Sequence, residues 1–329
     1  MRKKSHRKNK VSYFSLGIVL VILIWVVSVG LILIDKWENE QFGENADANL
    51  STVIEYNGTR YMYNPFLETI MILGIDTLDS IVDSGSYNND YKADFLSLVI
   101  INDNEQSYKI LHINRDTMTT VPVLGVTGQL ASYEEMQIAL SYNYGNGLKD
   151  SCENTKDAIS LMLGGISINR YLTLGMSAIP ILNDLAGGVT IELEDDFTEL
   201  DADLVVGETI TLNGEQALIY VRERGSLEDS SNLYRMERQQ NYLQALYTEL
   251  ADTEISWFES GISDITDYMV TDSSVTSLEA VIGDLGTYEF EGIVSIDGES
   301  VVYDLYNEYY LDEESLEQTI IDLFYIELD

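Results

Sequence analysis

One long uncharged run near the start of the chain constrains its architecture more than any other feature. The segment FSLGIVLVILIWVVSVGLILI spans Phe14 to Ile34, and its 21 residues carry no charge. A helix of this length crosses the hydrocarbon core of a bilayer. The run is too long for the core of a signal peptide, and no small-x-small cleavage site follows it. We therefore expect an uncleaved membrane anchor.

The charges on either side of this run predict its orientation. Six of the chain's 18 basic residues lie within the first ten positions, and the acidic segment DKWENEQFGENAD follows the run. Positive charge on the amino-terminal side indicates a cytoplasmic N-terminus. We predict a single-pass protein of the cell membrane with four parts: a cytoplasmic basic tail (1–13), a transmembrane helix (14–34), a stalk with a small hairpin (35–66) and an extracellular domain (67–329).

The composition of the chain excludes several classes of function. The 18 basic residues face 56 acidic ones, and the formal net charge of -38 repels DNA and RNA. Cys152 is the only cysteine, so no internal disulfide is possible, and His6 and His112 are the only histidines. A Cys/His zinc site is therefore excluded, and neither thiol catalysis nor a Ser-His-Asp triad is expected. We interpret His112, within YKILHIN, as an ordinary strand residue.

Three apolar runs predict the centre of a β-sheet. They cover residues 69–76, 95–102 and 107–114, and their nearly continuous apolar character is typical of strands covered on both faces. A tight hairpin around Asn57-Gly58 is expected before them. Further patterns predict helices over 132–144, 155–163, 177–186 and 212–221, one from about 233 and one in LEQTIIDLFYI, with short strands at 189–193 and in GIVSI. This order predicts an α/β domain with a mixed central sheet flanked by helices.

The strand order brings charged side chains to one edge of the sheet. The turn between residues 102 and 107 is short, so the second and third strands are expected to be antiparallel. Asp94, at the start of the second strand, then lies beside Arg115 and Asp116, at the end of the third. If the first strand is also antiparallel to the second, Asp76 joins them and Lys92 lies close by.

Arginines gather in a second segment, YVRERGSLEDSSNLYRMERQQ, between residues 220 and 240. Four of the seven arginines beyond the basic tail lie in it. If the segment is extended, Arg222 and Arg224 point the same way, because they are two residues apart. A single arginine in an acidic protein is usually a surface ion-pair partner. The clustering favours an anion site instead, because guanidinium groups match the geometry of phosphate.

The helix predicted from about residue 233 offers a further anion contact. Arg235 and Gln239 share one helical face, because they are four residues apart. Asn232 as the N-cap places Arg235 in the first turn, where the helix dipole disfavours a cation and a bound anion would compensate. The role of the remaining arginine, Arg238, stays open, and one interpretation is that it only braces the helix against a neighbouring carboxylate.

Asp76 and Asp94 together indicate a metal site. Two carboxylates with few other ligands suit Mg²⁺, which completes its octahedron with water and phosphate oxygens. The alternative is that both are ordinary strand-end or turn residues.

Several ordered sequence blocks resemble those of the LytR-CpsA-Psr family. They extend from about residue 67 to 250 and read MILGID, YKADFLSLVIIN, INRDT, DLAGGVTIEL, LNGEQALIYVRER and NLYRMERQQ. Members of this family are single-pass membrane proteins whose outer α/β domain transfers a glycopolymer from a polyprenyl-pyrophosphate carrier to peptidoglycan. The resemblance implies that Asp76 and Asp94 hold Mg²⁺, that pyrophosphate is gripped by Arg115, Arg222, Arg224, Arg235 and Gln239, and that Lys92 stands at a place commonly taken by arginine.

Three positions depart from the pattern of the family. Asn114 stands where many members have a proline, Asn232 where many have an aspartate, and Ser141, in LSYNYG, where the acceptor-side motif has a histidine. None of these removes an expected phosphate or metal ligand, but Asn232 and Ser141 leave the proton-transfer roles open.

The expected activity is a Mg²⁺-dependent phosphotransfer from a polyprenyl-pyrophosphate-linked glycan donor to a peptidoglycan acceptor at the outer membrane face. Asp94, Arg115 and Asp116 are the expected catalytic residues, with Asp94 or Asp116 as the base, while Lys92 is expected to contact the pyrophosphate. The polyprenyl chain requires an apolar slot, which we expect beneath the helices of 155–186. Two alternatives stay open: a non-catalytic membrane-anchored module that binds anionic polymer or relays a signal, and a lipid-pyrophosphate phosphatase.

Overall fold

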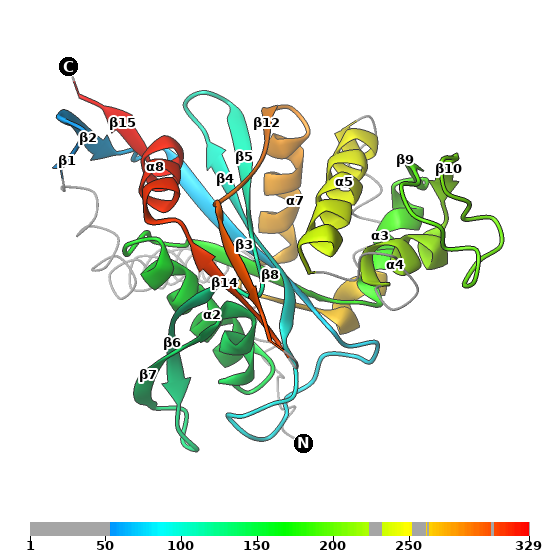
Figure 1. Cartoon of the computed structure of the whole chain (residues 1–329), viewed down its shortest axis with the longest axis horizontal. Helices are drawn as coiled ribbons and strands as arrows, with labels where there is room; N and C mark the ends of the chain where they lie inside the picture. Colours follow the sequence, from blue (N-terminus) through cyan, green and yellow to red (C-terminus); the bar gives the residue numbers. More distant parts are fainter. Residues whose placement is uncertain (1–52, 224–231, 252–260, 262, 304–305, 329) are drawn as a thin grey trace, which may run out of the picture. The chain divides into compact units, whose positions relative to one another are not determined.

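The computed structural model describes residues 53–223, 232–251, 261, 263–303 and 306–328 (Figure 1). The predicted basic tail, transmembrane helix and most of the stalk lie outside these residues. Within the described part of the chain, no helix is both long and apolar enough to cross a membrane.

A six-stranded mixed sheet forms the centre of the fold, in the order β11-β8-β3-β4-β5-β12. The neighbours β3, β4 and β5 are antiparallel, whereas β8 is parallel to β3 and β12 is parallel to β5. The three predicted strands and their antiparallel arrangement are therefore confirmed. The strands are β3 (Leu67–Ile75), β4 (Ala93–Asn102), β5 (Ser107–Ile113), β8 (Arg170–Gly175), β11 (Met269–Thr271) and β12 (Glu289–Ser295).

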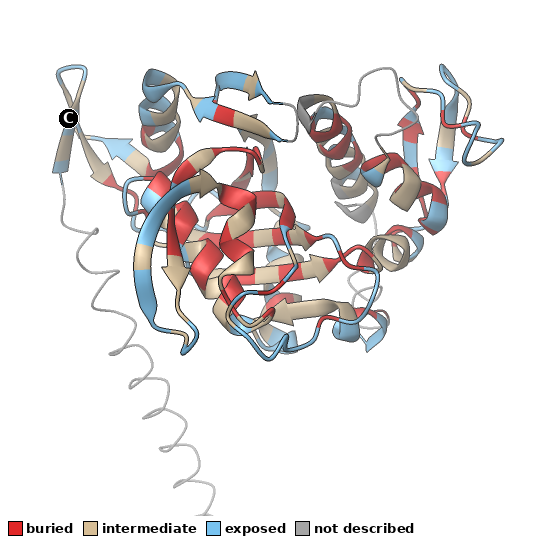
Figure 2. Cartoon of the chain, turned by 60° about the horizontal axis from the view of Figure 1, so that its bottom comes forward, coloured by how far each residue is buried: buried red, intermediate tan, exposed pale blue. Residues whose placement is uncertain are grey.

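Helices cover both faces of this sheet, which explains the nearly continuous apolar strands. On one face the core includes residues of α2 (Lys149–Met162), α8 (Glu313–Phe324) and the short 3-10 helix η1 (Ile138–Asn143). On the other face α7 (Val275–Leu285) packs on the strands. The inner strands β4 and β5 are mostly buried, whereas the edge strands β11 and β12 are half-buried or exposed (Figure 2). The predicted flanking of a mixed sheet by helices is confirmed.

A smaller apolar cluster lies beside the sheet and carries the arginine-rich segment. It joins the two-stranded sheet of β9 (Val189–Glu192) and β10 (Thr209–Leu212) to α3 (Ala178–Leu185), α4 (Gly214–Arg222) and α5 (Asn232–Ala251). Asn213 caps α4 by accepting a hydrogen bond from Gln216 N–H at 3.1 Å, and the Gln216 side chain accepts one from Asn213 N–H in return. This reciprocal cap fixes where α4 begins.

Three hairpins complete the described fold. The first joins β1 (Val53–Tyr56) to β2 (Thr59–Tyr63) through the predicted turn, in which Asn57 and Gly58 have φ of 51° and 81°. A third strand, β15 (Tyr325–Glu327), pairs with β2. The second joins β6 (Met118–Leu124) to β7 (Leu130–Gln137). The third joins β13 (Gly298–Val302) to β14 (Asn307–Leu311). A short 3-10 helix, η2 (Thr266–Tyr268), precedes β11.

The predicted helix over residues 132–144 is wrong. Tyr133, Met136 and Leu140 have helical spacing, but residues 130–137 form β7 and only Ile138–Asn143 form the 3-10 helix η1. Most of β7 is exposed or half-buried, so an apolar helical stripe would have no core to cover. Instead, the backbone of β7 forms its hydrogen bonds with β6, and this strand pairing outweighs the local helical spacing of the apolar residues.

His112 is a buried strand residue, as predicted. Its ring packs on Phe95 with centroids 4.9 Å apart, and its Nδ1 has no hydrogen-bond partner among the described residues. Burial, together with the nearby Arg235 charge, lowers the pKa of His112 from 6.5 to about 4. The folded protein therefore keeps this imidazole neutral.

This buried imidazole predicts a loss of stability in acid. Between pH 6.5 and about 4 the unfolded chain binds a proton at His112 that the folded chain does not bind. The free energy of unfolding should therefore fall as pH decreases through this window, by on the order of 3 kcal/mol from this group, and not further below it. Urea unfolding of the full chain and of His112→Leu at pH 7.5 and 4.5 tests this. A difference between the two proteins that does not change with pH would contradict it.

Candidate active site

Asp94 reaches the site through a β-bulge in β4. Gly74 of β3 pairs with Phe95, but the next residue of β3, Ile75, pairs with Ala93, so Asp94 is the extra residue. Ala93 and Leu96 both lie in the core cluster on the α2 side, although residues three apart on a regular strand face opposite ways. The bulge thus re-aims the Asp94 side chain, a role that bulges often have beside active sites.

Two arginines from different elements hold the Asp94 carboxylate. Arg115 Nη1, at the end of β5, donates a short hydrogen bond to Oδ1, and Arg235 Nη1, in the first turn of α5, donates to Oδ2 at 3.4 Å. The Arg235 and Asp94 side chains are only 3% and 6% exposed. Such a pair is costly to bury and costly to break. The predicted meeting of Asp94 with Arg115 is confirmed, and Arg235 is brought to the same carboxylate.

Asp116 is fixed by the two neighbouring hairpins. Its backbone N–H donates to Asn114 Oδ1 at 2.9 Å, and its Oδ1 accepts from Gln137 Nε2 of β7 at 3.0 Å. Its carbonyl oxygen accepts from Tyr309 N–H of β14 at 2.9 Å. Its Oδ1 also lies 3.6 Å from Arg115 Nε. Asp116 therefore joins the Asp94 cluster through Arg115, as predicted from the sheet edge.

The outer part of the site is more exposed. Arg222 Nη2 lies 3.5 Å from Asp76 Oδ1, and each side chain is 47% exposed. Asp76 N–H donates to the carbonyl of Lys92 at 3.4 Å, so the predicted closeness of these two residues is confirmed, and the Lys92 side chain is exposed. The condition of an extended segment is not met at Arg222, because Arg222 is the last residue of α4, and Glu223 after it is extended. Arg224 lies outside the described residues.

Arg238, whose role the sequence left open, has structural contacts. Its Nη1 and Nη2 donate to the carbonyls of Tyr220, at 2.9 Å, and of Glu223, and its Nε lies 3.8 Å from the Asp195 carboxylate. Its guanidinium also lies 5.4 Å from the centre of the Phe197 ring. These contacts link the C-terminal end of α4 to α5, and the Arg238 side chain is buried between them.

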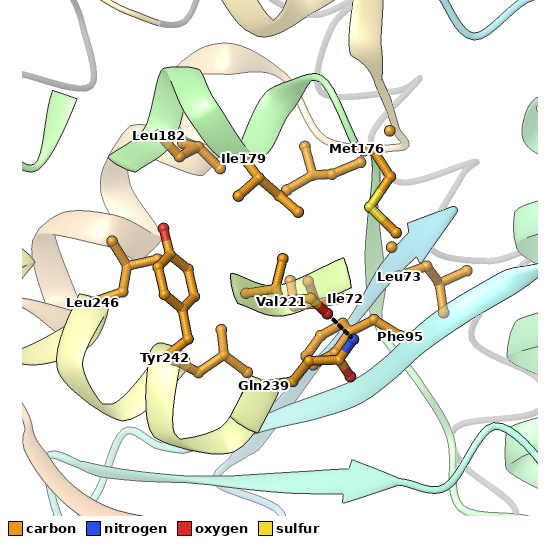
Figure 3. A pocket seen from close by; sticks show the side chains of 14 residues that line it. Ile72, Leu73, Phe95, Met176, Ile179, Leu182, Val221, Gln239, Tyr242 and Leu246 are labelled. Atoms are coloured by element: carbon orange, nitrogen blue, oxygen red, sulfur yellow. Dashed lines mark hydrogen bonds between the residues drawn. The ribbon is translucent and has the colours of Figure 1, made fainter. Parts of the chain in front are cut away.

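An apolar cavity of about 120 Å³ is lined by residues that neighbour the charged cluster in sequence (Figure 3). Phe95, the residue after Asp94, lines it, as does Gln239, one turn after Arg235. Gln239 Nε2 donates to the carbonyl of Val221 at 3.3 Å. The other lining residues are nearly all apolar and come from β3, β8 and its following turn, α3, α4 and α5: Ile72, Leu73, Gly74, Leu174, Gly175, Met176, Ile179, Leu182, Val221, Tyr242, Leu243 and Leu246.

The cavity partly agrees with the expected apolar slot. Helix α3, within the predicted range, contributes Ile179 and Leu182, whereas α2 contributes no lining residue. The wall opposite α3 is α5, so one helix carries both Arg235 and part of the apolar wall. A ligand with an anionic group joined to a hydrocarbon chain would match this junction.

Comparison with known proteins identifies the family. The model of the LytR_cpsA_psr family matches residues 45–323. The chain belongs to the LytR-CpsA-Psr family.

Relatives of this family member carry different names. TagU of Enterococcus faecalis, named polyisoprenyl-teichoic acid–peptidoglycan teichoic acid transferase, is 25% identical over 279 residues, which cover 83% of this chain and 82% of the relative. Biofilm regulatory protein A of Streptococcus mutans is 25% identical over 251 residues, 70% of this chain and 58% of the relative.

Solved structures share the LytR-CpsA-Psr fold described above. TagT bound to LIIa-WTA has a TM-score of 0.61 at 19% identity, covering 79% of this chain and 90% of that chain. TagV of B. subtilis has a TM-score of 0.59 at 20% identity, covering 79% and 96%. These likenesses show a common fold.

The charges of the cluster fit a divalent cation. Within the described part of the chain, no group of three or more His, Cys, Asp and Glu side chains gathers in a way that could hold a metal ion. However, Arg115 and Arg235 are balanced by Asp94 and Asp116, and Arg222 is balanced by Asp76. Lys92, whose carbonyl accepts from Asp76 N–H, adds one positive charge, so a bound dianion would leave these groups one charge negative and a divalent cation would compensate it. Mg²⁺ with one or two carboxylates and phosphate oxygens has this composition.

Two contacts of the site in this LytR-CpsA-Psr protein escaped sequence reasoning. Gln137 lies within the range predicted as a helix, and no sequence motif around Tyr309 predicts a contact with the site. Ser141, the departure from the acceptor-side motif, is buried and donates to the carbonyl of Ile138 at 2.6 Å. Cys152 is buried, and burial raises the pKa of its thiol to about 12, so it offers no nucleophilic thiolate.

Proposed function

We propose that this protein transfers a glycopolymer from a polyprenyl-pyrophosphate carrier onto peptidoglycan. One observation carries the proposal: the buried Arg235 and the half-buried Arg115 meet on the Asp94 carboxylate, and an apolar cavity is lined by Phe95, the residue after Asp94, and by Gln239, one turn after Arg235. A lipid pyrophosphate has the same two parts, a phosphate group and a long hydrocarbon chain. The name of the TagU relative, a teichoic acid transferase acting on peptidoglycan, supports the same reaction class.

The side chains divide into an inner and an outer set. Arg115 and Arg235 bind the pyrophosphate by exchanging part of their contact with Asp94 for phosphate oxygens. Arg222, Lys92 and Arg224 are assigned to the outer phosphate and the start of the polymer. Gln239 borders both the cluster and the cavity, and we assign it to the junction of pyrophosphate and lipid.

Asp76 and Asp94 are the residues we assign to Mg²⁺, which when bound would neutralise the pyrophosphate and stabilise charge that develops on it. This assignment gives a common role to the two carboxylates that lie among the arginines.

The chemical step is a phosphoryl transfer. A sugar hydroxyl of the wall attacks the phosphorus that carries the polymer, and a new P–O bond forms. The bond from that phosphorus to the bridging oxygen of the pyrophosphate breaks, so polyprenyl monophosphate leaves. Asp94 has a guanidinium on each oxygen, so we assign it to positioning and assign the hydroxyl proton to Asp116.

The proposed location follows from the substrates. A lipid-linked donor and a wall acceptor meet at the outer face of the membrane, where the anchor predicted at 14–34 would hold this domain with its N-terminus in the cytoplasm.

One reconstitution tests the proposal. The full chain in lipid nanodiscs is mixed with Mg²⁺, a lipid-linked saccharide and a peptidoglycan oligomer, and the products are separated by mass. We expect a joined product from the wild type and from Asp322→Asn, an exposed control on α8, and about a hundredfold less from Asp116→Asn. Release of the polymer as a phosphomonoester would indicate a phosphatase. Binding of the donor without any product would indicate a non-catalytic module.

A further inference from the structure

A tyrosine-rich surface lies on two neighbouring hairpins and shares no side chain with the arginine cluster. In the β13–β14 hairpin, Glu308 lies opposite Val301, and Tyr303 N–H donates to the Tyr306 carbonyl at 2.9 Å. Opposite residues share a face, and residues two apart on a strand share it too. Tyr303, Tyr306, Glu308 and Tyr310 therefore occupy one face of the hairpin.

This face points to solvent and is pre-arranged. Tyr303, Tyr306 and Tyr310 are 45%, 52% and 46% exposed, whereas the intervening Tyr309 is buried. The rings of Tyr303 and Tyr306 stack with centroids 5.0 Å apart, and Tyr310 OH donates to Glu308 Oε2 at 2.6 Å. Large aromatic rings are rarely left exposed together without a binding role.

The second hairpin extends this surface. Tyr133 and Glu135 lie on one face of β7 with Gln137, because they are two residues apart. The hydrogen bond to Glu308, followed by desolvation and then by the nearby charges of Glu308, Tyr303 and Glu135, raises the pKa of Tyr310 to about 12. Glu135 therefore lies near Tyr310. We call Tyr133, Glu135, Tyr303, Tyr306, Glu308 and Tyr310 the tyrosine surface.

The tyrosine surface is continuous with the candidate active site. A parallel bridge joins Thr117 to Tyr309, which sets β14 beside the start of β6 (Figure 1). Gln137 donates both to Asp116 Oδ1 and to the carbonyl of Asn307. The same backbone that holds Asp116 thus carries the tyrosines outward from it.

The chemistry of this surface selects its ligand. Exposed aromatic rings stack on the C–H faces of pyranose sugars, and carboxylates accept hydrogen bonds from hydroxyl and amide N–H groups. The carboxylates of Glu135 and Glu308 repel a polymer that carries phosphates along its length. A β-linked amino-sugar chain has the apolar ring faces and the hydroxyl and amide donors without that charge.

We propose that the tyrosine surface binds the glycan strand of the peptidoglycan acceptor and leads it toward Asp116. The inference rests on the proposed function for its role in transfer, but the binding itself is measurable without catalysis.

The test is titration calorimetry of the full chain with chitohexaose, an oligomer of N-acetylglucosamine, together with saturation-transfer NMR. Tyr306→Ala and Tyr310→Ala should each weaken binding by about five- to tenfold, and the double variant should weaken it further. Tyr310→Phe keeps the ring and should bind nearly as well as the wild type. Phe66→Ala is the matched control, because Phe66 is 53% exposed and lies at the turn before β3.

The outcomes separate this inference from the proposed function. Tyrosine-dependent binding of chitohexaose supports the surface even if the reconstitution yields no joined product. Equal binding by Tyr306→Ala and Phe66→Ala, or no binding at all, overturns it even if transfer is observed. Tyrosine-dependent binding of a glycerol-phosphate oligomer instead, or tyrosine-dependent dimers in sedimentation, would also overturn it by assigning the surface to the donor polymer or to a second copy.

Discussion

Arg235→Ala should lower the rate of transfer by about a thousandfold at saturating donor, because it removes a buried guanidinium placed to stabilise transferring phosphate. Arg235 also meets Asp94 at 3.4 Å in the interior, so the variant leaves a buried carboxylate with one arginine fewer. Arg235→Lys keeps the charge but loses the paired donors, and we expect it to recover only part of the rate. Initial rates of joined-product formation by the three proteins measure this effect.

The control for this prediction is Arg170→Ala, which removes an arginine from an ion pair with Glu68 at the far end of the sheet. It should leave the rate unchanged within about twofold, because such half-exposed pairs contribute little. Thermal unfolding of all variants excludes a loss of fold as the cause. A folded Arg235→Ala protein that transfers at the wild-type rate would remove Arg235 from the site.

Ile179→Trp should block the apolar cavity. Ile179 lies on α3 and lines a space of about 120 Å³, into which the larger tryptophan side chain would extend. Each methylene group of the lipid that is buried in the cavity contributes about 0.8 kcal/mol to binding. If the tryptophan excludes several of these groups, KM for a long-chain donor should rise by about thirty- to hundredfold. A donor with a short geranyl chain should react equally well with the variant and the wild type.

The control for this prediction is Leu161→Trp, a similar enlargement at an exposed position of α2 that does not line the cavity. It should leave both donors unaffected. If Ile179→Trp changes the two donors equally, the cavity does not hold the lipid chain.

The sequence predicted the parts of the fold that depend on local pattern. The runs that became β3, β4 and β5 were recognisable because both faces of the sheet are buried, and a short turn made β4 and β5 antiparallel. Asp94, Arg115 and Asp116 followed from that edge. Asn57-Gly58 was recognisable because few residue pairs adopt positive φ at both positions.

The remaining features depended on tertiary contacts. No residue type in this segment predicts the bulge at Asp94, which follows only from the pairing register of β4 with β3. Arg235 and Arg238 are three residues apart and both buried. Only their ion-pair partners show that Arg235 belongs to the candidate site and that Arg238 has a structural role. Gln137 is 21 residues from Asp116 and reaches it because β7 folds back on β6. The membrane segment, the domain boundaries and the Mg²⁺ site stay predictions.

The central claim concerns which phosphorus the wall hydroxyl attacks, and isotope labelling tests it most directly. A lipid-linked donor is prepared with ³²P only in the phosphate that carries the polymer, and it is incubated with the full chain, Mg²⁺ and a peptidoglycan oligomer. We predict that the label appears in the joined product as a phosphodiester, with one unlabelled polyprenyl monophosphate released for each linkage formed. Label released as polymer phosphomonoester or inorganic phosphate, or label that stays with the lipid, would contradict the account.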